Sequence, residues 1–175
     1  RTMPTLRFVP PYFKHPAYIN ALAQRFRESE AELTWSPDHY LITFHGIPNR
    51  YVKEGDPYRK QCEETADLLA KKLNLDNNNW TLSFQSRFGK EPWLEPYTEE
   101  VLEEFGKRDI KKLLTFCPGF TSDCLETIDE IGRESKEEFF EHGGKSFEFI
   151  SCLNSEESFI NAIMNIQKKA DIKIL

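Results

Sequence analysis

The sequence lacks several features that would assign it to common classes. It has no run of about 18 apolar residues, the length a membrane-spanning helix requires, and residues 1–8 lack the pattern of a signal peptide, so we expect a cytoplasmic protein. No G-x-G-x-x-G motif follows its first apolar strand, which argues against dinucleotide binding. The net charge of −6, without a Lys/Arg-rich stripe, argues against binding to nucleic acid.

The four cysteines also exclude some kinds of site. They show no C-x-x-C spacing, so the sequence indicates neither a structural zinc site nor an iron–sulfur cluster. With 175 residues, of which 39% are hydrophobic and 30% charged, the chain has the composition of a soluble globular protein. We expect one domain over residues 1–175. The opening on Arg1, followed by a proline-rich stretch, suggests that this domain was cut from a longer protein.

Apolar periodicity predicts helices alternating with strands. Short apolar runs predict strands at 40–44, 80–84, 113–117 and 147–150. Apolar residues at helical spacing predict helices at 16–33, 57–76, 98–105, 123–141 and 154–170. This order predicts an α/β fold with a doubly wound four-stranded parallel sheet flanked by helices on both faces. Within the helix at 123–141 we expect five buried residues: Leu125, Ile128, Ile131, Ser135 and Phe139.

In such sheets ligands bind beyond the carboxyl ends of the strands, so the residues that follow each strand are the candidates for chemistry. The first strand ends in the sequence F-H-G-I-P at 44–48. His45 therefore leaves a buried strand into a turn. Taken alone, a histidine of this kind is as often a buried, hydrogen-bonded residue as a metal ligand or a base.

The third strand leads through a turn at 117–122 to a group of carboxylates. Asp123 and Glu126 have the spacing of a capping box, which would make them structural residues at a helix start. Glu126, Asp129 and Glu130 share one side of the expected helix, and such a run is usually solvated. If this side is instead sheltered, like charges would raise the pKa of one carboxylate toward the range useful for proton transfer.

The second strand leads into a long connection at 85–96. Connections of this length are uncommon unless they bind something. Trp93, with Arg87 and Lys90, would suit a planar anionic ligand, although a loop tryptophan more often fastens its loop to the body. The remaining histidines have structural positions before a proline, ahead of a strand and at a helix end: His15, His39 and His142.

Together these segments resemble the ferrochelatase family. The similarity lies in four motifs in the family's order and at its intervals: F-H-G-I-P, G-D-P-Y, Q-S-R-F-G-K-E-P-W-L-E-P-Y-T and C-P-G-F-T-S-D-C-L-E-T-I-D-E-I. It extends from the F-V-P-P sequence at 8–11 to the last helix. The resemblance implies one of the two similar halves of a chelatase fold, here the carboxy-terminal half, with a porphyrin cleft between the halves and the amino-terminal half absent.

The resemblance also implies roles for individual residues. His45 and Glu126 match the family's catalytic histidine and glutamate, and both are candidates to contact the metal. Glu130 and Asp123 match an acidic path along which the metal passes. A further group matches a segment near the porphyrin: Trp93, Gln85, Ser86 and Arg87. Cys124 stands where some relatives carry a histidine, so that a second imidazole is absent.

The function implied is insertion of ferrous iron into protoporphyrin or a related porphyrin, with no cofactor beyond the Fe²⁺ substrate. The partners implied are the porphyrin, the iron, the missing half and, for the parent protein, peripheral contact with a membrane. Two alternatives stay open. The parent could be a cobalt chelatase acting on another tetrapyrrole, or this chain could be an isolated domain without activity of its own.

Overall fold

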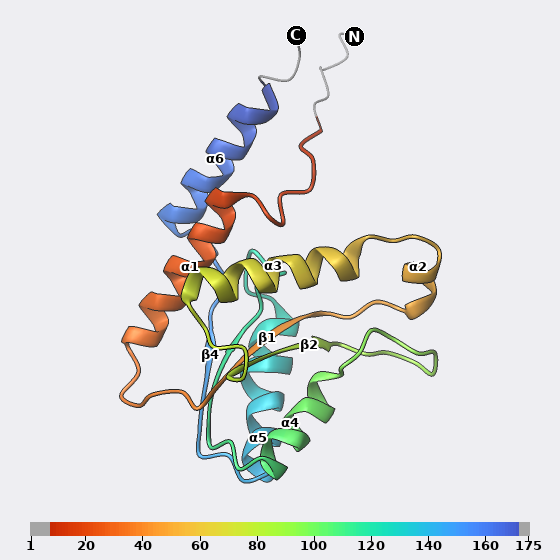
Figure 1. Cartoon of the computed structure of the whole chain (residues 1–175), viewed down its shortest axis with the longest axis vertical. Helices are drawn as coiled ribbons and strands as arrows, with labels where there is room; N and C mark the ends of the chain where they lie inside the picture. Colours follow the sequence, from red (N-terminus) through yellow and green to blue (C-terminus); the bar gives the residue numbers. More distant parts are fainter. Residues whose placement is uncertain (1–7, 172–175) are drawn as a thin grey trace.

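A four-stranded parallel sheet forms the centre of the protein (Figure 1). The computed structural model describes residues 8–171, and the side chains of residues 8–168. The strands are β1 (His39–His45), β2 (Trp80–Gln85), β3 (Lys112–Phe116) and β4 (Ser146–Ile150), in the order β2-β1-β3-β4. All three pairings are parallel. The predicted α/β fold and its four strands are confirmed.

Helices cover both faces of the sheet, as the sequence predicts. On one face lie α1 (Pro16–Ala31), α3 (Tyr58–Leu73) and α6 (Glu157–Asp171), over a core that includes Leu22, Phe26 and Leu69. On the other face lie α4 (Thr98–Lys107), η1 (Glu126–Ser135) and α5 (Lys136–Glu141). Figure 1 shows the two layers above and below the sheet. The two apolar clusters explain why the central strands are apolar on both faces.

The two central strands define where a ligand can bind. β1 is followed along the chain by β2 on one side, whereas β3 pairs on its other side. The chain therefore reverses its direction across the sheet between β1 and β3. In doubly wound sheets such a reversal leaves a crevice beyond the strands' carboxyl ends, where ligands bind. His45 ends β1 at this crevice.

The helix predicted at 123–141 differs in start and in geometry. It begins at Glu126, and its first ten residues form a π-helix, which α5 continues in α-helical form. Ile131, Ser135 and Phe139 are buried as predicted, but Leu125 is 73% exposed and Ile128 is 60% exposed. The prediction for these two residues is wrong. Leu125 precedes the helix, and the wider π-helical turn carries Ile128 away from the side that buries Ile131 and Ser135.

Neither pair with the spacing of a capping box, Asp123 with Glu126 or Asn154 with Glu157, forms one. Asn154 has a left-handed backbone, and its side chain bonds Asp123 instead of capping α6, which begins only at Glu157. Asp123 in turn bonds the segment before α6 and does not act as a cap for Glu126. A short helix that was not predicted, α2 (Asn49–Lys53), follows β1. Among the described residues, no helix has the length and apolar character needed to cross a membrane.

Candidate functional site

His45 is fixed at the carboxyl end of β1 in one orientation. Its backbone pairs with Gln85 at the end of β2, and its carbonyl accepts a hydrogen bond of 2.9 Å from the Tyr58 hydroxyl. The ring Nδ1 lies 2.6 Å from the Gly46 carbonyl oxygen. A carbonyl oxygen only accepts, so Nδ1 carries the proton and the neutral ring keeps its lone pair on Nε2. His45 therefore offers a free basic nitrogen.

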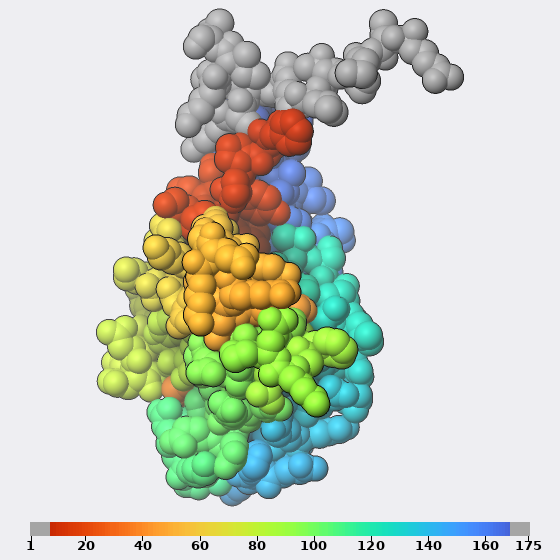
Figure 2. Space-filling model, turned by 90° about the vertical axis from the view of Figure 1, so that its right-hand side faces the viewer, coloured from red at the N-terminus to blue at the C-terminus, as the bar shows by residue number. Residues whose placement is uncertain are grey.

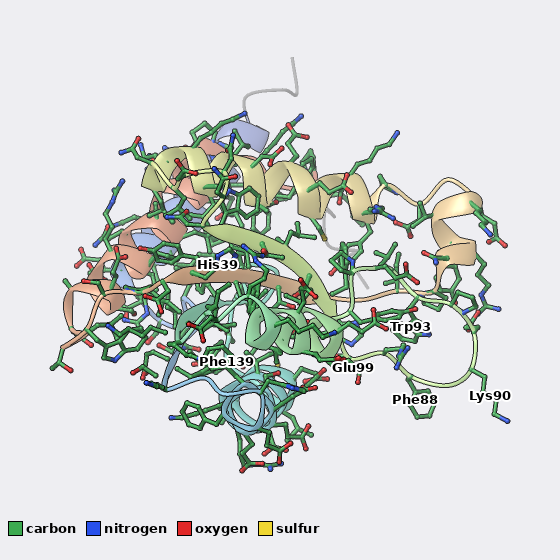
Figure 3. All side chains as sticks on the ribbon, turned by 60° about the horizontal axis from the view of Figure 1, so that its bottom comes forward. His39, Phe88, Lys90, Trp93, Glu99 and Phe139 are labelled. Carbon is green, nitrogen blue, oxygen red and sulfur yellow. The ribbon has the colours of Figure 1, made fainter. Side chains whose placement is uncertain are left out.

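Trp93 lies next to His45 because its loop is bonded to the segment after β1. Leu94 donates its N–H to the Ile47 carbonyl at 3.0 Å, and Pro48 forms a bridge with Trp93. The centroids of the Trp93 and His45 rings are 6.2 Å apart. Figure 3 shows Trp93 at the base of the loop, with Phe88 and Lys90 farther out along it. Trp93 therefore fastens its loop to the segment after β1, and its ring also lies beside His45 at the candidate site.

Gly46 is required by this close packing. A Cβ at this position would lie 3.0 Å from the Gln85 carbonyl oxygen and 3.2 Å from Cε3 of Trp93. Both distances are shorter than ordinary contacts, so any side chain would push the loop at 85–96 away from β1. The glycine of the F-H-G-I-P motif thus sets the distance between His45 and Trp93.

Glu126 opens the π-helix near His45. Its backbone carbonyl accepts a 2.8 Å hydrogen bond from the side-chain amide of Gln85. Its own backbone N–H and the Cys124 thiol lower the pKa of the Glu126 carboxyl, and so does His45 whenever its ring is protonated. Asp129 has a lowered pKa as well, because Arg133 bonds it. The sequence analysis considered a raised carboxyl pKa in case this side of the helix is sheltered from solvent. The pKa of Glu126 is instead lowered, so its carboxylate is charged at neutral pH.

Glu130 is tied to the end of β2. Its carboxylate accepts hydrogen bonds from the backbone N–H and from the hydroxyl of Ser86, both at 2.6 Å. Ser86 has a φ of 64°, a left-handed conformation that is costly for a residue with a side chain. The structure therefore joins Gln85 to Glu126 and Ser86 to Glu130 at the end of β2, where Gln85 pairs with His45.

Two predicted site residues are engaged elsewhere. The Asp123 carboxylate accepts hydrogen bonds from the backbone of Cys152 at 2.9 Å and from the Asn154 amide at 2.7 Å. Partial burial raises the pKa of Asp123, but these bonds outweigh it and the net shift is downward. Arg87 pairs with Glu99 and lies over the ring of Tyr97, with 4.3 Å between the guanidinium carbon and the ring centroid. Arg87 thus turns toward α4.

An acidic cavity that the sequence analysis missed lies between η1 and the end of β2. It has a volume of about 220 Å³, and Arg87 is the one cation in its lining. Burial, followed by the charge of Glu99, raises the pKa of Glu138 in its wall. The sequence pattern that could have indicated this cavity is a glutamate at every fourth position. This spacing brings four carboxylates to one stretch of helix surface: Glu126, Glu130, Glu134 and Glu138. All but Glu126 line the cavity.

The other histidines have structural roles, as predicted. His39 is buried against Phe105 and bonds Thr81, and His142 follows the last turn of α5. His15 accepts a hydrogen bond from the N–H of Ala17 at the start of α1. Within residues 8–168, no three His, Cys, Asp or Glu side chains form a cluster arranged to hold a metal ion. At the crevice the structure places the free Nε2 of His45 near the charged carboxylate of Glu126.

These features define the class of the protein: a doubly wound α/β domain with a basic and acidic site at its topological switch point. The chain belongs to the ferrochelatase family, since the family model described as Ferrochelatase matches residues 1–171. It is 46% identical to a protein named ferrochelatase from Brucella anthropi, over 97% of this chain and 48% of the relative. Ferrochelatases from Brucella ovis and Brucella melitensis biotype 1 show the same identity and coverage. The chain thus spans about half the length of these curated relatives.

Proposed function

We propose that this chain is the catalytic half of a ferrochelatase, which inserts ferrous iron into protoporphyrin or a related porphyrin. The observation that carries the proposal is the orientation of His45, whose Nε2 is free and basic beside the charged carboxylate of Glu126. Family membership supports the same reaction, because the Brucella relatives are named ferrochelatases.

The reaction requires bases close to the porphyrin. A divalent metal enters the ring only as two pyrrole N–H protons leave, so the charge gained from the metal is balanced by two protons lost. We assign these protons to His45 at Nε2 and to the Glu126 carboxylate. A positioned base of this kind contributes roughly 10²- to 10⁴-fold in rate. Either group is also able to contact the incoming iron before its transfer.

The porphyrin would lie against the wall formed by the ends of β1 and β2. Trp93 offers a flat surface beside His45, and Gln85 and Ser86 support that wall through their bonds to η1. We also assign Arg87 to porphyrin binding. Because Arg87 is paired with Glu99, its guanidinium would have to leave Glu99 to reach an anionic group of the porphyrin.

The iron would approach along η1. Glu130 follows Glu126 by four residues, and the acidic cavity continues past it toward Glu138. We assign Glu126 and Glu130 to this path. Asp123 belongs to the same acidic segment, but its hydrogen bonds favour a role in fixing the start of η1.

The partners of the proposed function are the porphyrin, ferrous iron and the half of the protein that the relatives contain in addition. We propose that this is the amino-terminal half, that no cofactor beyond Fe²⁺ takes part and that the whole protein acts in the cytoplasm, with peripheral contact to a membrane.

The reaction itself is tested with a full-length protein that contains this chain. Protoporphyrin and ferrous iron are mixed with it under anaerobic conditions, and loss of porphyrin fluorescence measures insertion. Cobalt and other tetrapyrroles are compared in the same assay. The proposal expects iron insertion into a protoporphyrin-type ring to be fastest. Preference for cobalt and a different tetrapyrrole would contradict it.

A further inference from the structure

The side chain of Gln85 is buried, although Gln85 stands at the candidate site. It lies at the end of β2 and is 3% exposed. Its amide nitrogen donates to the backbone carbonyl of Glu126 at 2.8 Å, and its amide oxygen accepts from the thiol of Cys117 at 3.5 Å. Both polar atoms of this side chain are therefore bonded within the domain. Gln85 is placed to hold other parts of the protein and not to face a bound ligand.

The Gln85 side chain crosses the central part of the sheet. Gln85 ends β2, Cys117 directly follows β3, and β1 lies between these two strands. Within β1, the residue that pairs with Gln85 is His45. The amide of Gln85 thus reaches over β1 beside His45 to the end of β3. In Figure 2, the yellow-green loop after β2 lies against the orange segment after β1, over the carboxyl ends of these strands.

The donors and acceptors fix one orientation of the amide. A backbone carbonyl only accepts, so the NH₂ group of Gln85 faces Glu126 and its oxygen faces Cys117. Cys117 must then donate. Its side chain is 0% exposed, and burial raises the pKa of its thiol well above the ordinary value, so the thiol keeps its proton at neutral pH. These two residues, called the Cys117–Gln85 pair below, form a directed chain of hydrogen bonds that ends at Glu126.

This chain of hydrogen bonds acts on the first turn of η1, because Glu126 is the residue at which the π-helix begins. Turns of this kind are rare and are often found at functional sites. Gln85 ties the backbone of Glu126 to the end of β2, and Ser86 bonds Glu130 one turn later. Two successive residues of one chain segment therefore hold the start of η1. The place of the Glu126 carboxylate relative to His45 depends on this attachment.

We propose that Cys117 and Gln85 are positioning residues, which hold the backbone of Glu126 so that its carboxylate stays near Nε2 of His45. This inference rests on the proposed function, which makes His45 and Glu126 the two bases. Neither residue of the pair touches the reacting atoms. Gln85 acts through the backbone of Glu126, and Cys117 acts through Gln85 by fixing the orientation of its amide.

The test measures kcat and KM of iron insertion in a full-length protein that contains this chain. Gln85→Met removes both hydrogen bonds at similar volume, and Cys117→Ala removes the thiol. We expect kcat to fall roughly 10- to 100-fold for Gln85→Met and roughly 3- to 10-fold for Cys117→Ala. The KM for the porphyrin should stay within about twofold, since the pair does not bind it.

Two further variants separate positioning from packing. Cys117→Ser keeps a donor at this position, because a hydroxyl also donates, and should regain most of the lost kcat. The double variant of Gln85→Met with Cys117→Ala should fall no further than Gln85→Met alone, because Cys117 acts through Gln85.

Hydrogen exchange measured by mass spectrometry gives a readout that does not depend on activity. Peptides that cover η1, residues 126–135, should exchange roughly 3- to 10-fold faster in Gln85→Met and Cys117→Ala. Ser83→Ala is the matched control. It removes a buried hydrogen bond of 2.9 Å between β2 and Thr98 of α4, and this bond does not involve η1. Both the exchange of η1 and the rate of insertion should be unchanged in this control.

Three results would overturn the inference. A raised KM for the porphyrin at unchanged kcat would show that Gln85 binds the porphyrin directly. Equal losses of kcat in Cys117→Ser and Cys117→Ala would show that the thiol serves packing and not donation. Unchanged exchange of η1 would show that the pair does not hold Glu126. The Cys117 variants decide the question if Gln85→Met does not fold. If the unsubstituted protein inserts no iron, the proposed function fails, whereas the exchange of η1 still decides whether the pair holds Glu126.

Discussion

Ser86 and Glu130 are joined by two hydrogen bonds, since the Glu130 carboxylate accepts from both the backbone N–H and the hydroxyl of Ser86 at 2.6 Å. This pair holds the end of β2 against the π-helix and keeps Ser86 in a left-handed conformation. It therefore links the loop that carries Trp93 to the helix that carries Glu126. The candidate site depends on this link as well as on its two catalytic residues.

Removal of the Glu130 carboxylate should loosen this link. We predict that Glu130→Ala lowers the free energy of unfolding by about 1–3 kcal/mol, because the buried part of Ser86 loses both hydrogen bonds. Urea unfolding of the chain measures this change. Glu137→Ala, at an exposed position of α5, is the matched control and should stay within about 0.5 kcal/mol of the unsubstituted chain. If both variants lost the same free energy of unfolding, the link between Ser86 and Glu130 would contribute nothing to stability.

Gly46→Ala should separate the loop from β1. The new methyl group would meet the Gln85 carbonyl at 3.0 Å and Trp93 at 3.2 Å, so we predict a destabilisation of about 1–3 kcal/mol. Trp93 fluorescence should change at the same time. Gly132→Ala is the control, because its methyl group would lie 3.4 Å from the nearest atom, the Thr127 carbonyl oxygen. A Gly46→Ala variant with unchanged stability would contradict the role given to this glycine.

The proton of His45 should be found on Nδ1. Because Nδ1 donates to the Gly46 carbonyl, we predict that the neutral ring is the Nδ1–H tautomer, with an unprotonated Nε2. Nitrogen-15 NMR of the histidine side chains at alkaline pH distinguishes the two tautomers. The spectrum of a His45→Gln variant assigns the signal. An Nε2–H tautomer at this position would leave the ring without its free base toward the crevice.

His39 should make the protein less stable in acid. Burial, and then the charge of Arg108, lowers the pKa of His39 from 6.5 to about 4 in the folded protein. The unfolded chain therefore binds a proton at higher pH than the folded chain does. The stability that His39 contributes is fully present above pH 6.5 and is lost as the pH falls through 4, by at most about 3 kcal/mol.

Unfolding in urea at several pH values between 7 and 4 checks this prediction. A His39→Gln variant removes the titrating group, and the comparison cancels the contributions of the carboxyl groups. We expect the difference in unfolding free energy between the two proteins to vary with pH in this window. A constant difference would show that His39 titrates with an ordinary pKa when folded.

Much of this architecture was predictable from the sequence, for physical reasons that can be named. The four apolar runs are long and bounded by turn residues, so the strands and their parallel arrangement followed. The place of His45 followed from its position after the first strand. Family resemblance, and not the spacing, selected His45 and Glu126 from the structural alternatives.

Other features depend on tertiary contacts that the sequence does not display. The helix begins only at Glu126 and starts with π-helical turns, so Leu125 before it and Ile128 within it were wrongly placed in the core. Asp123 and Asn154 carry ordinary capping signals but bond each other across two connections. The acidic cavity needs both η1 and the end of β2, although the regular spacing of its glutamates was visible. Arg87 is held by Glu99, twelve residues away.

The central claim is that His45 and Glu126 act together as the bases of porphyrin metalation. The most direct measurement is the single-turnover rate of iron insertion by a full-length protein that contains this chain, with His45→Ala, Glu126→Gln and both changes. The account predicts that each single variant loses roughly 10²- to 10⁴-fold in rate and that the double variant loses less than the product of the two. His142→Ala, at the exposed end of α5, should keep the full rate. Normal turnover in either single variant would contradict the account.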